Sequence, residues 1–210
     1  MSKIRDAFQN KKAFVGFLTA GDPSLAKTEE FIITMEKAGA SVIEIGVPFS
    51  DPIAESPVVQ EANVRALSAE GGCTTDMIFD MLARVKDKVS VPIVLMSYLN
   101  PVYKFGYEEF MAKCAETGVS GLIIPDMPYD ERSELLPFAD KYDIDIISLV
   151  APASKSRIRM IAEDAKGYIY VLPSLNATDT RNDIVTDISG IVAEIRQVTD
   201  VPVILEIGVH

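Results

Sequence analysis

The chain has 210 residues, of which 48% are hydrophobic and 24% charged, and this balance predicts a single globular domain over residues 1–210. Its 20 basic and 31 acidic residues give a net charge of −11, which disfavours nucleic acid and anionic membranes as partners. The N-terminal residues are charged and no apolar run reaches about 20 residues, so we expect a soluble, cytoplasmic protein. Cys73 and Cys114 are predicted to be reduced thiols, and their spacing predicts no metal site.

Short apolar runs rich in β-branched residues alternate with longer segments of helical periodicity. Several of these runs are apolar almost throughout, as is typical of strands covered on both faces in a parallel sheet. The predicted strands, in chain order, are Phe14–Leu18, Val42–Gly46, Pro92–Met96, Gly121–Ile124, Asp145–Val150, Tyr168–Leu172 and Val201–Ile207. The predicted helices between them are Leu25–Ala38, Met77–Lys88, Tyr107–Thr117, Glu131–Tyr142, Lys155–Ala165 and Ile188–Val198.

This succession predicts an α/β fold, a parallel (β/α) TIM-type barrel. Polar and special residues follow the C-terminal ends of many predicted strands, which is where such barrels place their active sites. A complete barrel needs one more β/α unit after the seventh predicted strand, so we expect an incomplete barrel of about seven strands. Three explanations stay open: the barrel closes in a smaller or distorted form, another chain covers its edges, or the chain is a fragment.

The most specific segment runs from Glu44 to Glu55 and reads EIGVPFSDPIAE. It predicts a buried strand that ends in one acid, followed by a Pro-rich loop that ends in a second acid. A carboxyl at an apolar strand end loses hydration, which is expected to raise the pKa of Glu44 toward the range of a general acid. The alternative is a structural acid together with a solvated loop acid.

This segment resembles the signature of tryptophan synthase alpha subunits, in which a Glu on the second strand is followed by Gly, Pro-Phe-Ser-Asp-Pro and an acid. Further stretches similar to that family read FLTAGDP at 17–23, MSYLNP at 96–101, PDMP at 125–128 and SLVAP at 148–152. They occur in the family's order and cover roughly residues 1 to 175.

The resemblance implies a retro-aldol cleavage of indole-3-glycerol phosphate to indole and glyceraldehyde 3-phosphate, without a metal or organic cofactor. Glu44 matches the family's catalytic glutamate, which protonates the indole ring carbon and takes the proton of the side-chain hydroxyl. Glu55 stands where the family most often has Asp, which handles the indole N–H. By the same matching, the indole pocket would be lined by Phe17, Tyr98 and Tyr170, for which core packing is the alternative role.

The resemblance also implies a partner, a pyridoxal-phosphate beta subunit that receives indole through a tunnel. The contacting face would include Asp51 and Pro52 of the loop and the stretch Asn100–Pro101. The pyridoxal phosphate would belong to that partner and not to this chain.

Two loops depart from the family pattern where it binds the substrate phosphate. The family's Gly-Val-Thr-Gly loop reads Asn-Ala-Thr-Asp at 176–179, which keeps only Thr178, and its Gly-Phe-Gly reads Glu-Ile-Gly at 206–208, which keeps Gly208. A carboxylate about 5 Å from the phosphate would oppose it by roughly 3 kcal/mol at an effective dielectric constant near 20. Asp179 and Glu206 would each weaken phosphate binding if they point inward, and would not if they rotate to solvent.

These departures support a second hypothesis, an engineered or degenerate barrel scaffold with an impaired phosphate site, either inactive or with a new site around Glu206. A third hypothesis is a non-catalytic fragment that associates with itself through open barrel edges. Native catalysis would need another anion site in place of the altered loops. Self-association would appear as a concentration-dependent mass in light scattering.

Overall fold

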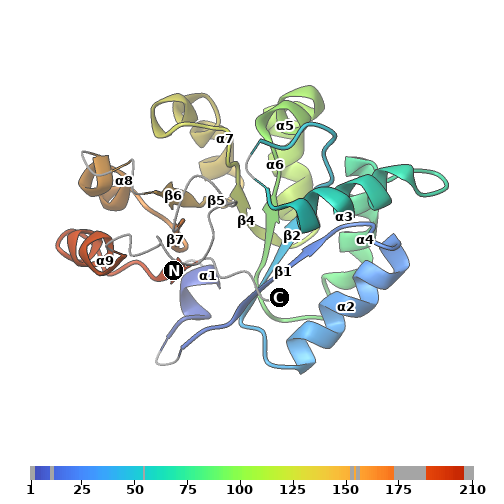
Figure 1. Ribbon diagram of the computed structural model, residues 1–210, viewed down its shortest axis with the longest axis horizontal. Helices are drawn as coiled ribbons and strands as arrows, with labels where there is room; N and C mark the ends of the chain where they lie inside the picture. The colour runs from blue at the N-terminus through green and yellow to red at the C-terminus, as the bar shows by residue number, and fades with distance from the viewer. Residues whose placement is uncertain are drawn as a thin grey trace.

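The computed structural model describes residues 3–9, 12–53, 55–151, 154, 157–172 and 188–205, in which parallel strands alternate with helices (Figure 1). The strands form two sheets, one of five strands in the order β1-β2-β3-β4-β5 and one of three in the order β6-β7-β8, and every pair is parallel. Their bounds are β1 Val15–Thr19, β2 Val42–Gly46, β3 Ile93–Met96, β4 Val119–Ile123, β5 Asp145–Ile146, β6 Ser148–Val150, β7 Ile169–Val171 and β8 Val203–Leu205.

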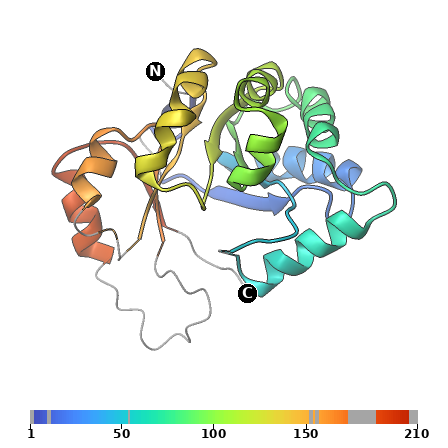
Figure 2. The same cartoon turned by 90° about the horizontal axis from the view of Figure 1, so that it is seen from above.

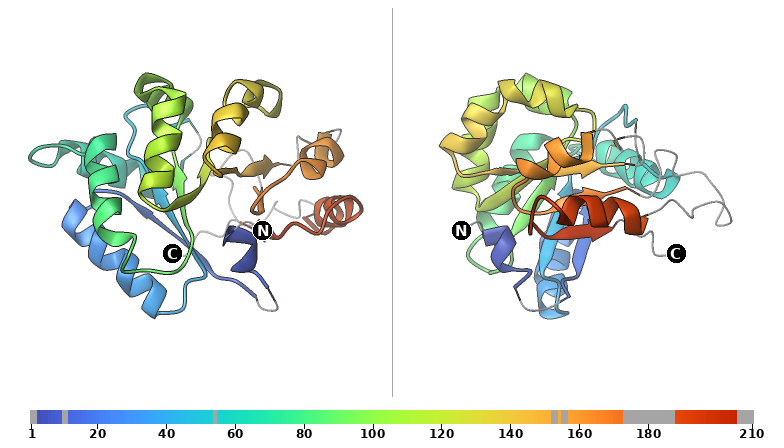
Figure 3. Two further views of the ribbon diagram at one scale, coloured as in Figure 1. Left: turned by 180° about the vertical axis from the view of Figure 1, so that it is seen from behind. Right: turned by 90° about the vertical axis from the view of Figure 1, so that its left-hand side faces the viewer.

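Apart from α1, the helices lie outside the strands, with α2 to α4 beside the five-stranded sheet and α8 and α9 beside the three-stranded one (Figures 1, 2 and 3). Their bounds are α1 Lys3–Asp6, α2 Leu25–Lys37, α3 Pro57–Ser68, α4 Thr75–Val85, α5 Leu99–Phe105, α6 Tyr107–Glu116, α7 Leu136–Lys141, α8 Ile158–Glu163 and α9 Ile188–Arg196, with the 3₁₀ helix η1 at Tyr129–Glu134. Within the described ranges, every helix is too short or too polar to cross a lipid bilayer.

The predicted parallel α/β fold is confirmed, with two elements divided. The predicted strand Asp145–Val150 is divided into β5 and β6 at Ile147, whose N–H still donates to the carbonyl of Leu122 at 3.0 Å. The predicted helix Glu131–Tyr142 is divided into η1 and α7, because Pro137 in the first turn of α7 has no N–H to continue the preceding helix.

Helices α1, α3 and α5 were not predicted from the sequence. For α3 the start signal was present, since the hydroxyl of Ser56 accepts from the N–H of Val59 and Pro57 stands in the first turn. The Pro-rich character of the preceding segment had suggested a loop throughout. The structure instead ends the loop at Ser56 and begins a helix of 12 residues.

Alternate residues of the strands face two different cores. Ile43 and Ile45 of β2 pack outward with helix residues, whereas Val42 packs inward among strand residues. The inward cluster of buried residues comprises Ile4, Val42, Val94, Ile123, Ile147, Tyr168 and Tyr170. Ile4 of α1 is fully buried in it, and its Cδ1 lies 2.7 Å from the position that a Cβ on Gly121 would take. Helix α1 therefore fills part of the interior beside the middle of β4.

Both cysteines are free and buried, in agreement with the predicted reduced thiols. Burial raises the pKa of Cys73 to about 11, so its thiol stays protonated at neutral pH.

Candidate active site

Glu44 lies on the inward face of β2, between Phe17 of β1 and Val94 of β3 in the strand register. Its side chain is only 2% exposed. The hydroxyl of Tyr168, a fully buried residue just before β7, donates a hydrogen bond to Oε1 of Glu44. Because β2 and β7 belong to different sheets, this hydrogen bond crosses the interior and joins them.

The Tyr168 phenol is held in its donor form. Burial, followed by the charge of nearby Glu44 and the hydrogen bond to it, raises the pKa of Tyr168 well above its usual value. The hydroxyl thus stays protonated and directed at the carboxyl. The structure adds Tyr168 to the predicted site, in which only Tyr170, two residues further on, was expected from the sequence.

Glu55 lies in the loop before α3 and is half-buried. The side-chain amide of Asn63 in α3 donates to Oε2 of Glu55 at 2.5 Å, and the hydroxyl of Tyr98 also hydrogen bonds this carboxyl. Burial raises the pKa of Glu55, and the hydrogen bonds from Asn63 and Tyr98 oppose that rise. Glu55 is therefore a carboxyl with shifted acidity held by two neutral donors, as a general acid or base requires.

Tyr98 follows β3 and is buried, with its ring centroid 5.1 Å from that of Phe49. The next residue, Leu99, donates its N–H to Oδ1 of Asp126 at 2.8 Å, which ties the start of α5 to the segment after β4. Tyr98 therefore contacts the Glu55 carboxyl from a well-packed position. Its predicted role against an indole ring stays a prediction.

Phe17 and Tyr170, the other two predicted pocket aromatics, lie on the interior side with Glu44. The Phe17 ring covers Gly46, two residues beyond Glu44 on the same face of β2, and comes within 2.7 Å of the position that a Cβ there would occupy. Phe17 is nevertheless 37% exposed, so part of its ring is open to solvent or a ligand. Tyr170 is buried with its ring 6.5 Å from that of Tyr168.

The remaining predicted residues lie at the surface or outside the described ranges. Asp51 and Asn100 are exposed, and Pro52 and Pro101 are half-buried, Asn100 and Pro101 being part of α5. Thr178 and Gly208, predicted to hold the phosphate, lie outside the described residues, as do Asp179 and Glu206.

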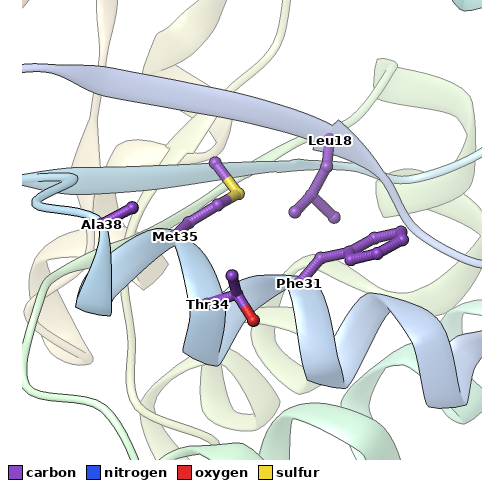
Figure 4. Close-up of a pocket in the computed structure, with 5 residues that line it drawn as sticks. All are labelled: Leu18, Phe31, Thr34, Met35 and Ala38. Carbon is purple, nitrogen blue, oxygen red and sulfur yellow. The ribbon is translucent and has the colours of Figure 1, made fainter.

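An apolar cavity of about 250 Å³ lies between β1 and α2, lined by Leu18, Phe31, Thr34, Met35 and Ala38 (Figure 4). Leu18 and Phe17 are adjacent on β1 and point to opposite faces of the sheet. The cavity is thus on the outer side of the sheet and separate from the two carboxyls.

Sequence reasoning missed Tyr168 and Asn63. Tyr168 stands two residues before Tyr170 and so shares its face of the strand, a signal that could have been used. Asn63 lies on the buried face of α3 with Ala62 and Ala66. A lone amide among alanines indicates a polar side chain that needs a buried partner.

Comparison with known proteins identifies the family. The family model described as tryptophan synthase alpha chain matches residues 4–210. The chain belongs to the tryptophan synthase alpha chain family. It is 43% identical over 210 residues to the tryptophan synthase alpha chain of Lacticaseibacillus casei, covering 100% of this chain and 78% of that protein. It is 41% identical over 200 residues to that of Alkaliphilus metalliredigens, covering 95% and 74%.

Solved structures of this family have the same fold. The tryptophan synthase subunit alpha of Legionella pneumophila superposes with a TM-score of 0.87 at 30% identity, covering 100% of this chain and 79% of that one. The predicted TIM-type barrel and the predicted family role, cleavage of indole-3-glycerol phosphate in tryptophan biosynthesis, are confirmed. These relatives give no support to the engineered scaffold.

Removing the Tyr168 hydroxyl tests its contact with Glu44. We expect Tyr168→Phe to lower kcat for indole release roughly tenfold, because the ring stays but the carboxyl loses a buried donor. Steady-state kinetics with indole-3-glycerol phosphate measure this effect, and a thermal melt checks that the fold is kept. An unchanged kcat in a folded Tyr168→Phe variant would contradict a functional role for the hydrogen bond.

Proposed function

We propose that Glu44 and Glu55 are the acid–base pair that performs the lyase reaction of this chain. The observation that carries this proposal is the buried Glu44 carboxyl on the interior face of β2, with one oxygen held by Tyr168. Burial disfavours a charged carboxylate, and an acid group is what protonation of an indole ring carbon needs. The resemblance of the segment 44–55 to the signature of the family supports the same assignment.

The proton transfers of the reaction can be carried out by two carboxyl groups. Glu44 in its acid form protonates the indole carbon that bears the side chain, while Glu55 as a carboxylate accepts the N–H proton. The bond between that carbon and the glycerol side chain then breaks, and its electrons return to the ring. Glu44 takes the proton of the hydroxyl that becomes the aldehyde, and Glu55 returns a proton to the ring nitrogen. Both carboxyls end in their starting states.

We assign substrate contacts to the aromatic side chains and the altered loops. Phe17 lies in the middle of β1, opposite Glu44 of β2, and is partly exposed, which supports a contact with the flat indole. Tyr98 and Tyr170 complete the proposed indole pocket. Thr178 and Gly208 are proposed phosphate contacts on the family resemblance alone.

The partner proposed for this chain is a tryptophan synthase beta subunit. The alpha chain of this family carries no cofactor of its own, and pyridoxal phosphate belongs to the beta subunit. We place the contact at Asp51, Pro52, Asn100 and Pro101. The adjacent Ile53 and Tyr103 are among the most exposed large apolar side chains of the described residues, which supports a protein contact there. Self-association through β1 and β8, each at the end of its sheet, and a cytoplasmic location remain predictions.

Indole release from indole-3-glycerol phosphate, measured without added metal or pyridoxal phosphate, tests the assignment. We expect Glu55→Gln to lower kcat by about a hundredfold, since an amide cannot exchange the N–H proton. Glu55→Asp keeps a carboxyl at this position, so its kcat is expected to stay much closer to the parental value than that of Glu55→Gln. Equal rates for Glu55→Gln and the parent chain would remove Glu55 from the mechanism.

A further inference from the structure

Two side chains of helix α3 donate hydrogen bonds to Glu55. The side-chain amide of Gln60 donates to the backbone carbonyl of Glu55 at 2.9 Å, and that of Asn63 donates to its carboxyl oxygen Oε2 at 2.5 Å. Ser56, the residue after Glu55, caps the start of the helix, because its hydroxyl accepts a hydrogen bond from the N–H of Val59. The backbone and the carboxyl of Glu55 are thus both fixed by the helix that follows it.

Helix α3 is itself anchored to the loop after β1. Arg65 donates through Nε to Oδ1 of Asp22 at 3.0 Å and through Nη2 to Oδ2 at 2.8 Å, a paired arrangement that restricts orientation as well as distance. Asn63 lies two residues before Arg65, on the buried face of the helix. The amide that reaches Glu55 therefore projects from a fixed element and not from a mobile loop.

Asn63 is 3% exposed, and a buried amide is costly unless it is hydrogen bonded. Its NH₂ group finds that partner in a carboxyl on a loop. An asparagine amide has no proton to exchange in this chemistry, so it can hold a carboxyl but cannot replace one as acid or base.

We propose that Asn63 is a positioning residue for the lyase reaction, holding the Glu55 carboxyl in place from α3 so that it can exchange the indole N–H proton. This inference rests on the proposed role of Glu55. The residue concerned lies in α3, outside the motif segment 44–55. It also accounts for how the longer Glu, in place of the family's usual Asp, is kept at a defined position.

The pKa of Glu55 distinguishes a positioning role of Asn63 from a purely structural one, because only a direct contact with the carboxyl would change this pKa. The groups that face its carboxyl are Asn63 of α3 and the phenol of Tyr98 after β3, and within the described residues no charged side chain adds to the pKa shift. Asn63 lowers the pKa of Glu55 against the rise caused by burial. Loss of this donor must therefore raise the pKa of Glu55, which leaves less carboxylate at a given pH.

The test uses Asn63→Leu, which removes the donor at similar size, and Asn63→Asp, which keeps the shape but places a second carboxyl beside Glu55. Carbon-13 NMR of labelled glutamate carboxyls follows the titration of Glu55, assigned by its loss in Glu55→Gln. We expect the titration to move to higher pH in both Asn63 variants. In the same variants kcat is expected to fall roughly tenfold with KM changed by less than about twofold. Val64→Leu, on the exposed face of α3, is the matched control.

A double-variant series separates the two proposals. In the Glu55→Gln background, Asn63→Leu is expected to cause little further loss of kcat, because Asn63 acts through Glu55. If Glu55→Gln is impaired while both Asn63 variants keep the parental titration and kcat, the positioning role is wrong and the role of Glu55 stands. If Glu55→Gln is fully active, the role of Glu55 itself is wrong, and Asn63 cannot be positioning a catalytic group. Asn63→Asp provides the titration if Asn63→Leu does not fold.

Discussion

Glu44→Gln is expected to lower kcat for indole release by about a thousandfold or more, the largest effect on activity that we predict. The amide keeps the shape of the side chain and can still accept the Tyr168 hydrogen bond, so the interior packing is retained. It can neither protonate the ring carbon nor take the hydroxyl proton. Since both transfers pass through the same group, neither step has a substitute. The measurement is single-turnover and steady-state indole release over a range of substrate concentrations.

The control for Glu44→Gln is Glu70→Gln, the same substitution at an exposed position after α3. It is expected to leave kcat and KM at parental values. A small change in KM alongside the lost kcat in Glu44→Gln would place the effect in the transition state and not in substrate binding. Retention of even a tenth of the parental kcat by Glu44→Gln would refute its role as the acid.

Phe110→Ala is expected to lower the free energy of unfolding by about 3–5 kcal/mol, the largest effect on stability that we predict. Phe110 of α6 is fully buried, and its ring lies 5.2 Å from Phe79 of α4 and 5.7 Å from Phe105 of α5 in edge-to-face arrangements. Truncation would leave a cavity where three helices meet beside the sheet. Urea denaturation followed by circular dichroism measures the change, with an unchanged m-value showing that the native state is otherwise kept.

Tyr103→Ala is the matched control for Phe110→Ala, because it truncates a 67% exposed aromatic residue on the adjoining helix α5. Its cost is expected to stay below about 1 kcal/mol. A loss of similar size in both variants would mean that burial at the centre of the three rings does not decide the effect.

Much of the fold follows from local patterns. The apolar run at 42–46 has hydrophobic residues on both faces, and the structure buries all five residues of β2. Helix α6 begins and ends within one residue of its prediction, because Gly106 and Gly118 bracket it with positive φ angles of 98° and 82°. The bend that separates β5 from β6 had no comparable signal. It occurs within a continuous apolar run, where nothing local distinguishes a straight strand from a bent one.

The site was predictable where it depends on one stretch of chain. Glu44 and Glu55 were found together because the strand end and the loop that carry them are continuous in sequence. Asn63 was missed although it is only eight residues from Glu55, since α3 had not been predicted and its buried face could not be assigned. The Phe17 ring over Gly46 likewise depends on the pairing of β1 with β2 and not on either strand alone.

By itself the sequence determined the alternation of parallel strands with helices, the family and the two candidate carboxyls, because periodicity, helix signals and contiguous motifs are local properties of the chain. Only the tertiary structure decided what holds each carboxyl. Tyr168 and Glu44 are 124 residues apart, and they meet because β2 and the residue just before β7 direct those side chains to the same interior from different sheets. Such a contact is set by strand register and facing direction, which arise when the strands pack and are not encoded in either segment separately.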